Sequence, residues 1–274
     1  MNSTFKKVCI IGLGLIGGSI GLAMKRSKIS NQIIGFARSN STLKRAIELG
    51  LVDKVKDNLE DAVNDCDLII LATPLSTFKK LVEEMSPFLK KDCIITDTGS
   101  AKLSVIEDLR GILPNNVEFI PGHPIAGTEE SGPDAGFAEL FDNRWCILTP
   151  TEENSSNAIG LIKEFWESIG SKVEIMDPLH HDKVLAITSH IPHLIAFNIV
   201  GTANNLANVT EKEVVKYSAG GFRDFTRIAA SDPKMWSDIF TYNSEAVLEM
   251  LELFSNDLAK LKAAVIKKDS DLLF

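Results

Sequence analysis

Short apolar segments alternate with amphipathic segments over the first two thirds of the chain. Several of the segments that we predict to be strands are apolar nearly throughout, as strands covered on both faces are. The predicted strands are 8–11, 33–36, 68–72, 93–96, 118–120, 146–149 and 173–176. Segments between them, such as 76–89 and 157–169, carry apolar residues at helical spacing. This alternation predicts an α/β fold with a doubly wound, mostly parallel sheet.

The pattern changes at the Asp177-Pro178 dipeptide. Beyond it we find no convincing strand, and spacings of three and four residues dominate, as in "SEAVLEMLELFSNDLAKLKAAV". We therefore predict an α/β domain over 1–176 and an all-helical domain over 177–274. The helical pattern over 183–206 is apolar on most sides, so that helix must be buried. A domain this small can bury only so much by itself, which predicts a homodimer through the helical domain.

Composition and charge narrow the class of protein. Hydrophobic residues make up 45% of the 274, and the net charge of -8 argues against a general nucleic-acid or anionic-membrane binder. The start, "MNSTFKKVCI", lacks the shape of a secretory signal, and the most apolar later stretch, 191–200, is too short to span a bilayer. We expect a cytoplasmic protein with neither nucleic acid nor membrane as partner. The four cysteines form no CxxC pair and are expected to be small buried residues.

A glycine-rich turn follows the first predicted strand, in "VCIIGLGLIGGSIG". Gly12, Gly14 and Gly17 form the G-x-G-x-x-G pattern between a strand and a helix. The first glycine permits the tight turn, the second lets a pyrophosphate approach the backbone, and the third lets helix and strand pack closely. The helix N-terminus then presents free N–H groups to the phosphates. The context predicts a Rossmann-type dinucleotide site, with a purely structural turn as the alternative.

The end of the second strand indicates which dinucleotide binds. An NAD site usually carries an acidic residue there, but the first acidic residue of this chain is Glu48. Arg38, Ser39 and Ser41 occupy the expected place, and a cation with hydroxyls suits a 2′-phosphate. This favours NADP, while NAD remains possible and Arg38 could be only a solvated charge.

A third cofactor element is the "LATP" segment, which ends a buried strand where Thr73 and Pro74 would border the ribose and nicotinamide. The residues predicted to bind cofactor lie in the turn, after the second strand and in this segment: Gly12, Leu13, Gly14, Leu15, Ile16, Gly17, Arg38, Ser39, Ser41, Ala72, Thr73 and Pro74.

Two further strand ends carry residues that can do chemistry. Ser100 follows a strand in "TDTGSAK", and His123 stands between glycine and proline in "PGHPIAGTEESG". A histidine held this way in a loop is a poor candidate for core packing, although a structural role stays open. The ordinary pKa of histidine, ~6.5, lets it accept a proton near neutrality. Ser100 could hydrogen-bond the same substrate hydroxyl, cap the next helix, or do both.

The helical domain adds two motifs. His190 and His193 have HxxH spacing in "SHIPHL", but Pro192 lies between them and no HExxH motif accompanies them, so we expect no metal site. The stretch "GGFRDFTRIAASDPKMW" combines glycine, arginine and aromatic residues. Arginine binds carboxylates through two parallel hydrogen bonds, so this stretch suits a pocket for a planar, carboxylated molecule. The alternative is a surface loop with ion pairs.

Taken in order, "GLGLIGGS", "TDTGSAK", "PGHPIAGTEESGP", "SHIPH" and "GFRDFTRIAASDPKMW" resemble the prephenate/arogenate dehydrogenase family, the cyclohexadienyl dehydrogenases of tyrosine biosynthesis. The resemblance covers nearly the whole chain. It implies an NAD(P)-dependent oxidative decarboxylation in which the ring loses a hydride and carbon dioxide and becomes aromatic. It also implies a dimer through the helical domain and, because the chain ends soon after that domain, no fused chorismate mutase or regulatory domain.

The resemblance also implies roles for single residues. His123 resembles the catalytic base, Ser100 its partner on the ring hydroxyl, and Arg227 the arginine that holds a substrate carboxylate. Further residues match positions that line the pocket or shape its entrance, and Gly220 among them would reach the neighbouring subunit's site: His193, Gly220, Trp236, Glu129 and Asp182. The cofactor turn departs from the members that carry an acid, so a preference for NAD does not carry over.

Two alternatives remain open at this point. One is another two-domain dehydrogenase acting on a hydroxy acid or an imine, which would use a lysine such as Lys183 but would not explain His123 and Arg227. The other is a non-catalytic NADP-sensing dimer. The residues do not distinguish prephenate from arogenate as substrate.

Overall fold

The computed structural model of the protein describes residues 4–205 and 219–273. The chain divides into two compact units by packing: Met1–His181 with Asp232–Tyr242, and Asp182–Ser231 with Asn243–Phe274. The first unit contains both sheets, and the second is helical.

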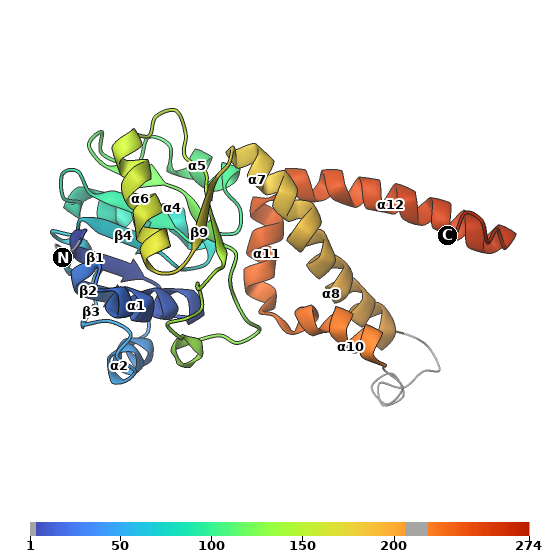
Figure 1. Cartoon of the computed structure of the whole chain (residues 1–274), viewed down its shortest axis with the longest axis horizontal. Coiled ribbons are helices and arrows are strands. Elements are labelled where there is room, and N and C mark those ends of the chain that lie inside the picture. Colours follow the sequence, from blue (N-terminus) through green and yellow to red (C-terminus); the bar gives the residue numbers. More distant parts are fainter. Residues whose placement is uncertain (1–3, 206–218, 274) are drawn as a thin grey trace. The chain divides into compact units, whose positions relative to one another are not determined.

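A six-stranded parallel sheet forms the centre of the first unit (Figure 1). Its strands lie in the order β3-β2-β1-β4-β5-β6, and every pairing is parallel. The bounds are β1 (Phe5–Ile11), β2 (Ser30–Phe36), β3 (Lys54–Lys56), β4 (Leu68–Leu71), β5 (Ile94–Asp97) and β6 (Glu118–Ile120). The strand order reverses between β1 and β4, which is where sheets of this topology bind ligands at their carboxyl edge. The doubly wound α/β prediction is confirmed.

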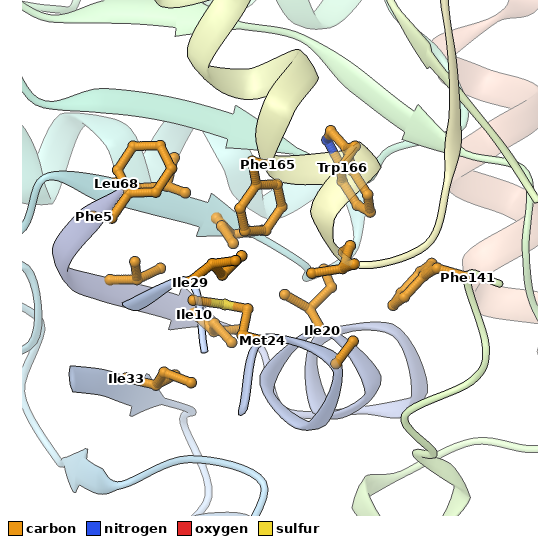
Figure 2. Packing of buried hydrophobic residues seen from close by; sticks show 14 of the residues in the cluster. Phe5, Ile10, Ile20, Met24, Ile29, Ile33, Leu68, Phe141, Phe165 and Trp166 are labelled. Atoms are coloured by element: carbon orange, nitrogen blue, oxygen red, sulfur yellow. The ribbon is translucent and has the colours of Figure 1, made fainter. Parts of the chain in front are cut away.

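Helices cover the sheet: α1 (Leu15–Ser27), α2 (Asn40–Glu48), α3 (Leu59–Val63), α4 (Phe78–Met85), α5 (Leu103–Leu109) and α6 (Ser156–Ser168). The larger core lies between β1 and the helices α1 and α6, where Phe165 and Trp166 of α6 meet Ile20 and Met24 of α1 (Figure 2). The rings of Phe165 and Trp166 are edge to face, with centroids 5.3 Å apart. Apolar spacing along both helices therefore fixes which faces are buried.

The other face of the sheet is also covered, as the apolar strands predict. Val8 and Ile10 belong to the core described above, whereas their buried neighbours Cys9 and Ile11 point to the opposite face because side chains alternate along a strand. All four cysteines are buried and free, which confirms their interpretation as small core residues. Burial raises the pKa of the Cys66 thiol to about 11 and that of Cys93 to about 12, so both stay protonated.

A second, three-stranded sheet continues the chain after β6. Its strands are β7 (Gly122–Pro124), β8 (Trp145–Leu148) and β9 (Lys172–Ile175), with β7 antiparallel and β9 parallel to β8. The sequence predicted β8 and β9 but not β7 or β3, because those three-residue strands lack an apolar run. It also did not predict that the last strands separate from the parallel sheet.

The second unit begins at Asp182, inside α7 (Pro178–Leu185), and continues through a π-helical turn (Ala186–His190) into α8 (Ile191–Asn204). Its small core joins Ala186 and Ile191 to Ala246 and Val247 of α12 (Ser244–Lys267). The Lys183 ammonium lies 2.9 Å from the Glu249 carboxylate on α12. The helical pattern predicted over 183–206 is thus confirmed up to Asn204, and residue 206 lies outside the described residues.

Many large apolar side chains of the second unit are exposed among the described residues. The exposed apolar side chains of α12 are Leu248, Leu253, Phe254, Leu258, Leu261, Val265 and Ile266. The continuous helix over Pro178–Ala203 has 26 residues and is long and apolar enough to cross a membrane. Only 28% of its most apolar 18-residue stretch is buried. The expectation that this region is too short is therefore wrong. Length and composition remain weak evidence for a membrane span, and the expected homodimer would cover the same kind of surface.

The packing boundary differs from the predicted boundary at 176/177. The helix α11 (Pro233–Tyr242) packs with the first unit, although the segments before and after it in the sequence, up to Ser231 and from Asn243, belong to the second. Ser76 makes the connection, because its backbone N–H and hydroxyl both donate to the Asp238 carboxylate, at 3.2 and 2.5 Å. Helical periodicity alone could not reveal which unit α11 joins.

Candidate active site

The glycine turn has the geometry of a dinucleotide cradle. Gly12 has φ +99°, a left-handed conformation that suits glycine, and a Cβ there would lie 2.4 Å from the Ala72 oxygen. A Cβ on Gly17 would lie 1.9 Å from the Gly12 oxygen, so only glycine lets α1 pack this closely. A Cβ on Gly14 would meet nothing within 4 Å, which leaves open space beside the N-terminus of α1. The residues present therefore fit a bound pyrophosphate.

Four strand ends meet at this edge of the sheet. The pairings Ile11↔Phe36, Ile11↔Leu71 and Leu71↔Asp97 put the carboxyl ends of β2, β1, β4 and β5 side by side. The predicted cofactor segments and Ser100 follow these ends directly. Thr73, after β4, shares a hydroxyl–hydroxyl hydrogen bond of 2.7 Å with Thr77.

The end of β2 presents one cation and two hydroxyls. Arg38 is exposed and has no carboxylate partner in the described part of the chain. Ser39 caps α2 by accepting from the Thr42 N–H, and its hydroxyl lies 2.5 Å from that of Ser41. Arg45 on α2 is engaged elsewhere, because its Nε and Nη2 donate to Asp134 Oδ1 at 2.9 and 2.5 Å. Arg38 is therefore the cation that this edge leaves available for a ligand.

His123 lies on β7 with 7% of its surface exposed. Its Nδ1 is 2.9 Å from Nε2 of His181, which is fully buried at the first turns of α7, and the two rings meet edge to face. His181 is not predictable as a site residue from the sequence, because 58 residues separate it from His123 and no local motif marks it. A histidine whose second nitrogen is hydrogen-bonded has a fixed ring orientation, as acid–base catalysis requires.

Ser100 is half-buried in the loop between β5 and α5. Two fully buried side chains flank that loop, the Asp97 carboxylate and the Lys102 ammonium, and they form an ion pair. Asp97 accepts from the backbone N–H groups of Gly99 and Gly122, at 2.8 and 3.0 Å, and Lys102 donates to the Gly122 carbonyl at 2.7 Å. Asp97 and Lys102 belong to the same "TDTGSAK" motif as Ser100, but the motif alone does not predict that they pair. The ion pair ties the Ser100 loop to the strand that carries His123.

The other predicted site residues divide between the two units. In the first unit Glu129 is exposed on a loop, and Trp236 of α11 is buried with its ring centroid 5.5 Å from that of Phe240. In the second unit Asp182 is buried, while Gly220 and Arg227 are exposed at α10 (Gly220–Thr226) and the adjoining 3₁₀ turn (Arg227–Ala230).

The HxxH histidines have separate partners. His193 Nδ1 donates to the Ser189 carbonyl at 2.9 Å, and burial lowers the pKa of His193. His190 Nδ1 lies 3.0 Å from the Asn243 amide nitrogen, which also donates to the Asp182 carbonyl. Within residues 4–205 and 219–273, no group of three His, Cys, Asp or Glu side chains is arranged to hold a metal ion.

Comparison with known proteins places these features in one family. Residues 20–175 match the nucleotide-binding domain of prephenate dehydrogenase, and residues 177–274 match its dimerization domain. The chain is 44% identical to a cyclohexadienyl dehydrogenase of Zymomonas mobilis, over 99% of this chain and 92% of that protein. It is 34% identical to a prephenate dehydrogenase of Bacillus subtilis, over 100% of this chain and 74% of that protein.

A solved structure extends the likeness to the fold. Prephenate dehydrogenase from Aquifex aeolicus, in complex with hydroxyphenyl propionate and NAD⁺, superposes with a TM-score of 0.92 at 36% identity, covering 100% of this chain and 95% of that one. The resemblance identified from the motifs is thus confirmed over both domains. The chain belongs to the prephenate dehydrogenase family of oxidoreductases, with a nucleotide-binding domain followed by a dimerization domain.

Proposed function

We propose that the protein catalyses the NAD(P)-dependent oxidative decarboxylation of prephenate, arogenate or both, to 4-hydroxyphenylpyruvate, tyrosine or both. The observation that carries the proposal is His123, which is buried, hydrogen-bonded to His181 and next to Gly122, whose N–H donates to Asp97 at the carboxyl end of β5. A bound nicotinamide would accept the hydride from the ring carbon that carries the hydroxyl.

His123 takes the ring-hydroxyl proton in this proposal. We assign to His123 the tautomer whose Nδ1–H donates to His181 Nε2, so that its Nε2 is the atom that accepts the substrate proton. As the hydride leaves, the O–H electron pair forms a carbonyl. The carboxyl group then departs as carbon dioxide, and its bonding electrons make the ring aromatic and return the oxygen to a phenolate. That phenolate takes the proton back, so no net proton is consumed.

The remaining polar residues would hold the substrate. Ser100 hydrogen-bonds the ring hydroxyl, and Arg227 binds a carboxylate with its guanidinium fork. Gly220, His193, Trp236, Glu129 and Asp182 line the pocket or its entrance, with Gly220 serving the neighbouring subunit's site. The exposed apolar face of α12 supports a homodimer through the second unit.

The cofactor preference is proposed to be for NADP, with NAD as second choice. Arg38, Ser39 and Ser41 stand where a 2′-phosphate would lie, and no carboxylate competes for Arg38 in the described chain. The Aquifex aeolicus relative was solved with NAD⁺, so cofactor choice has to be measured on this chain.

The direct test is a steady-state comparison of two substrates with two cofactors, following the reduced nicotinamide. We expect turnover in at least one of the four combinations, and none in any of them would refute the proposal. His181→Asn probes the orienting role, and its matched control is His180→Asn, which changes the adjacent, exposed histidine of α7. We expect a loss of kcat in His181→Asn of about tenfold or more and no change in the control.

A further inference from the structure

Two backbone groups of Gly122 are held by side chains instead of by the sheet. Gly122 begins β7, where the chain leaves the parallel sheet after β6 and enters the three-stranded sheet as a strand antiparallel to β8. The backbone hydrogen bond between this part of the chain and the end of β8 is made by the residue before Gly122, since the Thr149 N–H donates to the Pro121 carbonyl. The Gly122 N–H donates to Asp97, and its carbonyl accepts from Lys102.

The same two side chains hold the Ser100 loop. Asp97 Oδ2 accepts from the Gly99 N–H at 2.8 Å, and the Lys102 backbone lies two residues beyond Ser100. A Cβ on Gly99 would lie 2.4 Å from a Leu75 methyl and 2.8 Å from the Asp97 carboxylate, so this loop has little room to move. One ion pair therefore connects the residue before Ser100 with the residue before His123.

Stability is a weak reason for such a pair. Both side chains are fully buried, and burying two charges costs desolvation free energy that a well-packed apolar pair would avoid. This ion pair also hydrogen-bonds three backbone groups, the N–H of Gly99 and the N–H and carbonyl of Gly122. It therefore fixes the geometry of the two chain segments, which an apolar pair could not do.

We propose that Asp97 and Lys102 are positioning residues that set the separation of Ser100 and His123 for proton transfer. The inference rests on the proposed roles of those two residues. Without the ammonium, the Gly122 carbonyl and the Asp97 carboxylate each lose a partner, and β7 can shift against the Ser100 loop. A misplacement of about 1 Å at reacting groups can cost about a hundredfold in rate.

The test combines Lys102→Met with His123→Asn. We expect Lys102→Met to lower kcat by about tenfold to a hundredfold while the Kd of the cofactor changes by less than about twofold. Because Lys102 acts through His123, adding Lys102→Met to His123→Asn should lower kcat by less than about threefold more. A merely structural contribution would multiply in full with the loss caused by His123→Asn.

The chain provides a matched control at the other end of the same sheet. Asp67, before β4, accepts from the backbone N–H groups of Lys6 and Lys7, and the Lys90 ammonium lies 2.6 Å from its carboxylate. This pair has the same chemistry but lies at the amino edge of the sheet, away from the carboxyl-edge site. Lys90→Met should keep the wild-type kcat.

Each outcome decides between the proposals. Absence of wild-type turnover, or a His123→Asn variant as fast as wild type, refutes the proposed function itself. With those intact, a wild-type kcat in Lys102→Met, or a full multiplicative loss in the double variant, overturns the positioning role. If Lys102→Met does not fold, Asp97→Asn/Lys102→Met, which buries no unpaired charge, replaces it throughout. If neither folds, the pair is a folding determinant and the inference is wrong.

Discussion

Replacing single glycines of the turn with alanine should separate its packing role from its ligand role. In Gly17→Ala the new Cβ would start 1.9 Å from the Gly12 oxygen, whereas ordinary contacts begin at 3.4 Å. Helix α1 must therefore move away from the turn by about 1.5 Å, against a core that is already filled. Overpacking of this kind costs up to about 3 kcal/mol, and the better helix propensity of alanine returns about 1 kcal/mol. The net loss of about 2 kcal/mol corresponds to a fall in Tm of about 4–8 °C.

Gly14→Ala should behave in the opposite way. Nothing lies within 4 Å of its added Cβ, and the residue has φ -85°, which alanine adopts without strain. Loss of a glycine at the helix N-cap costs only about 0.5–1 kcal/mol. The methyl group would occupy the space into which the pyrophosphate is proposed to fit, so we expect cofactor affinity to fall at least about tenfold.

The assay is thermal melting with and without cofactor, together with a fluorescence titration of NADP and NAD. Gly160→Ala is the matched control, because this glycine lies exposed inside α6 with nothing within 4 Å of an added Cβ. It should raise stability by about 0.5–1 kcal/mol and leave cofactor binding unchanged. Wild-type cofactor affinity in Gly14→Ala, or a wild-type Tm in Gly17→Ala, would refute the assignment of the two roles.

Four further predictions concern single side chains. His123→Asn should lower kcat by about 10²–10⁴-fold and spare cofactor affinity, and a variant that kept more than about a third of the rate would show another base. Arg227→Ala should raise KM for the substrate with little change in kcat, so an unaltered KM would place Arg227 outside the pocket. Arg38→Ala should remove a preference for NADP of about tenfold to a hundredfold and leave NAD kinetics alone, and wild-type protein that uses NAD equally well would contradict this. Burial alone would raise the pKa of Asp67, but hydrogen bonds from Lys90 and two backbone amides lower it. The ionised Asp67 carboxylate therefore stabilises the folded protein above about pH 4, and this stabilisation is lost as the pH falls through the lowered pKa of the folded state. Asp67→Asn should flatten the acid side of a plot of Tm against pH, and an unchanged acid side would argue against a native hydrogen-bonded carboxylate.

Local patterns were sufficient for the architecture of the first unit. The apolar runs that became β1, β4 and β5 are buried on both faces, and the residues between them have helical spacing. The roles of Gly12 and Gly17 were also predictable, because a left-handed turn and a close helix–strand contact each require glycine within a few residues. The short strands β3 and β7 could not be predicted, since three residues give no periodic pattern and these strands form by pairing with their neighbours.

The sequence by itself determined the α/β plan, the dinucleotide turn and the motifs that mark the family, because each depends on residues close together along the chain. Tertiary structure alone decided that His181 meets His123, that α11 packs with the first unit, and that Asp97 and Lys102 hold the backbone of Gly122. Each of those contacts joins segments whose separation is set by the path of the whole chain. A side chain's type shows what it can bind, but its partner depends on where the sheet and helices bring it.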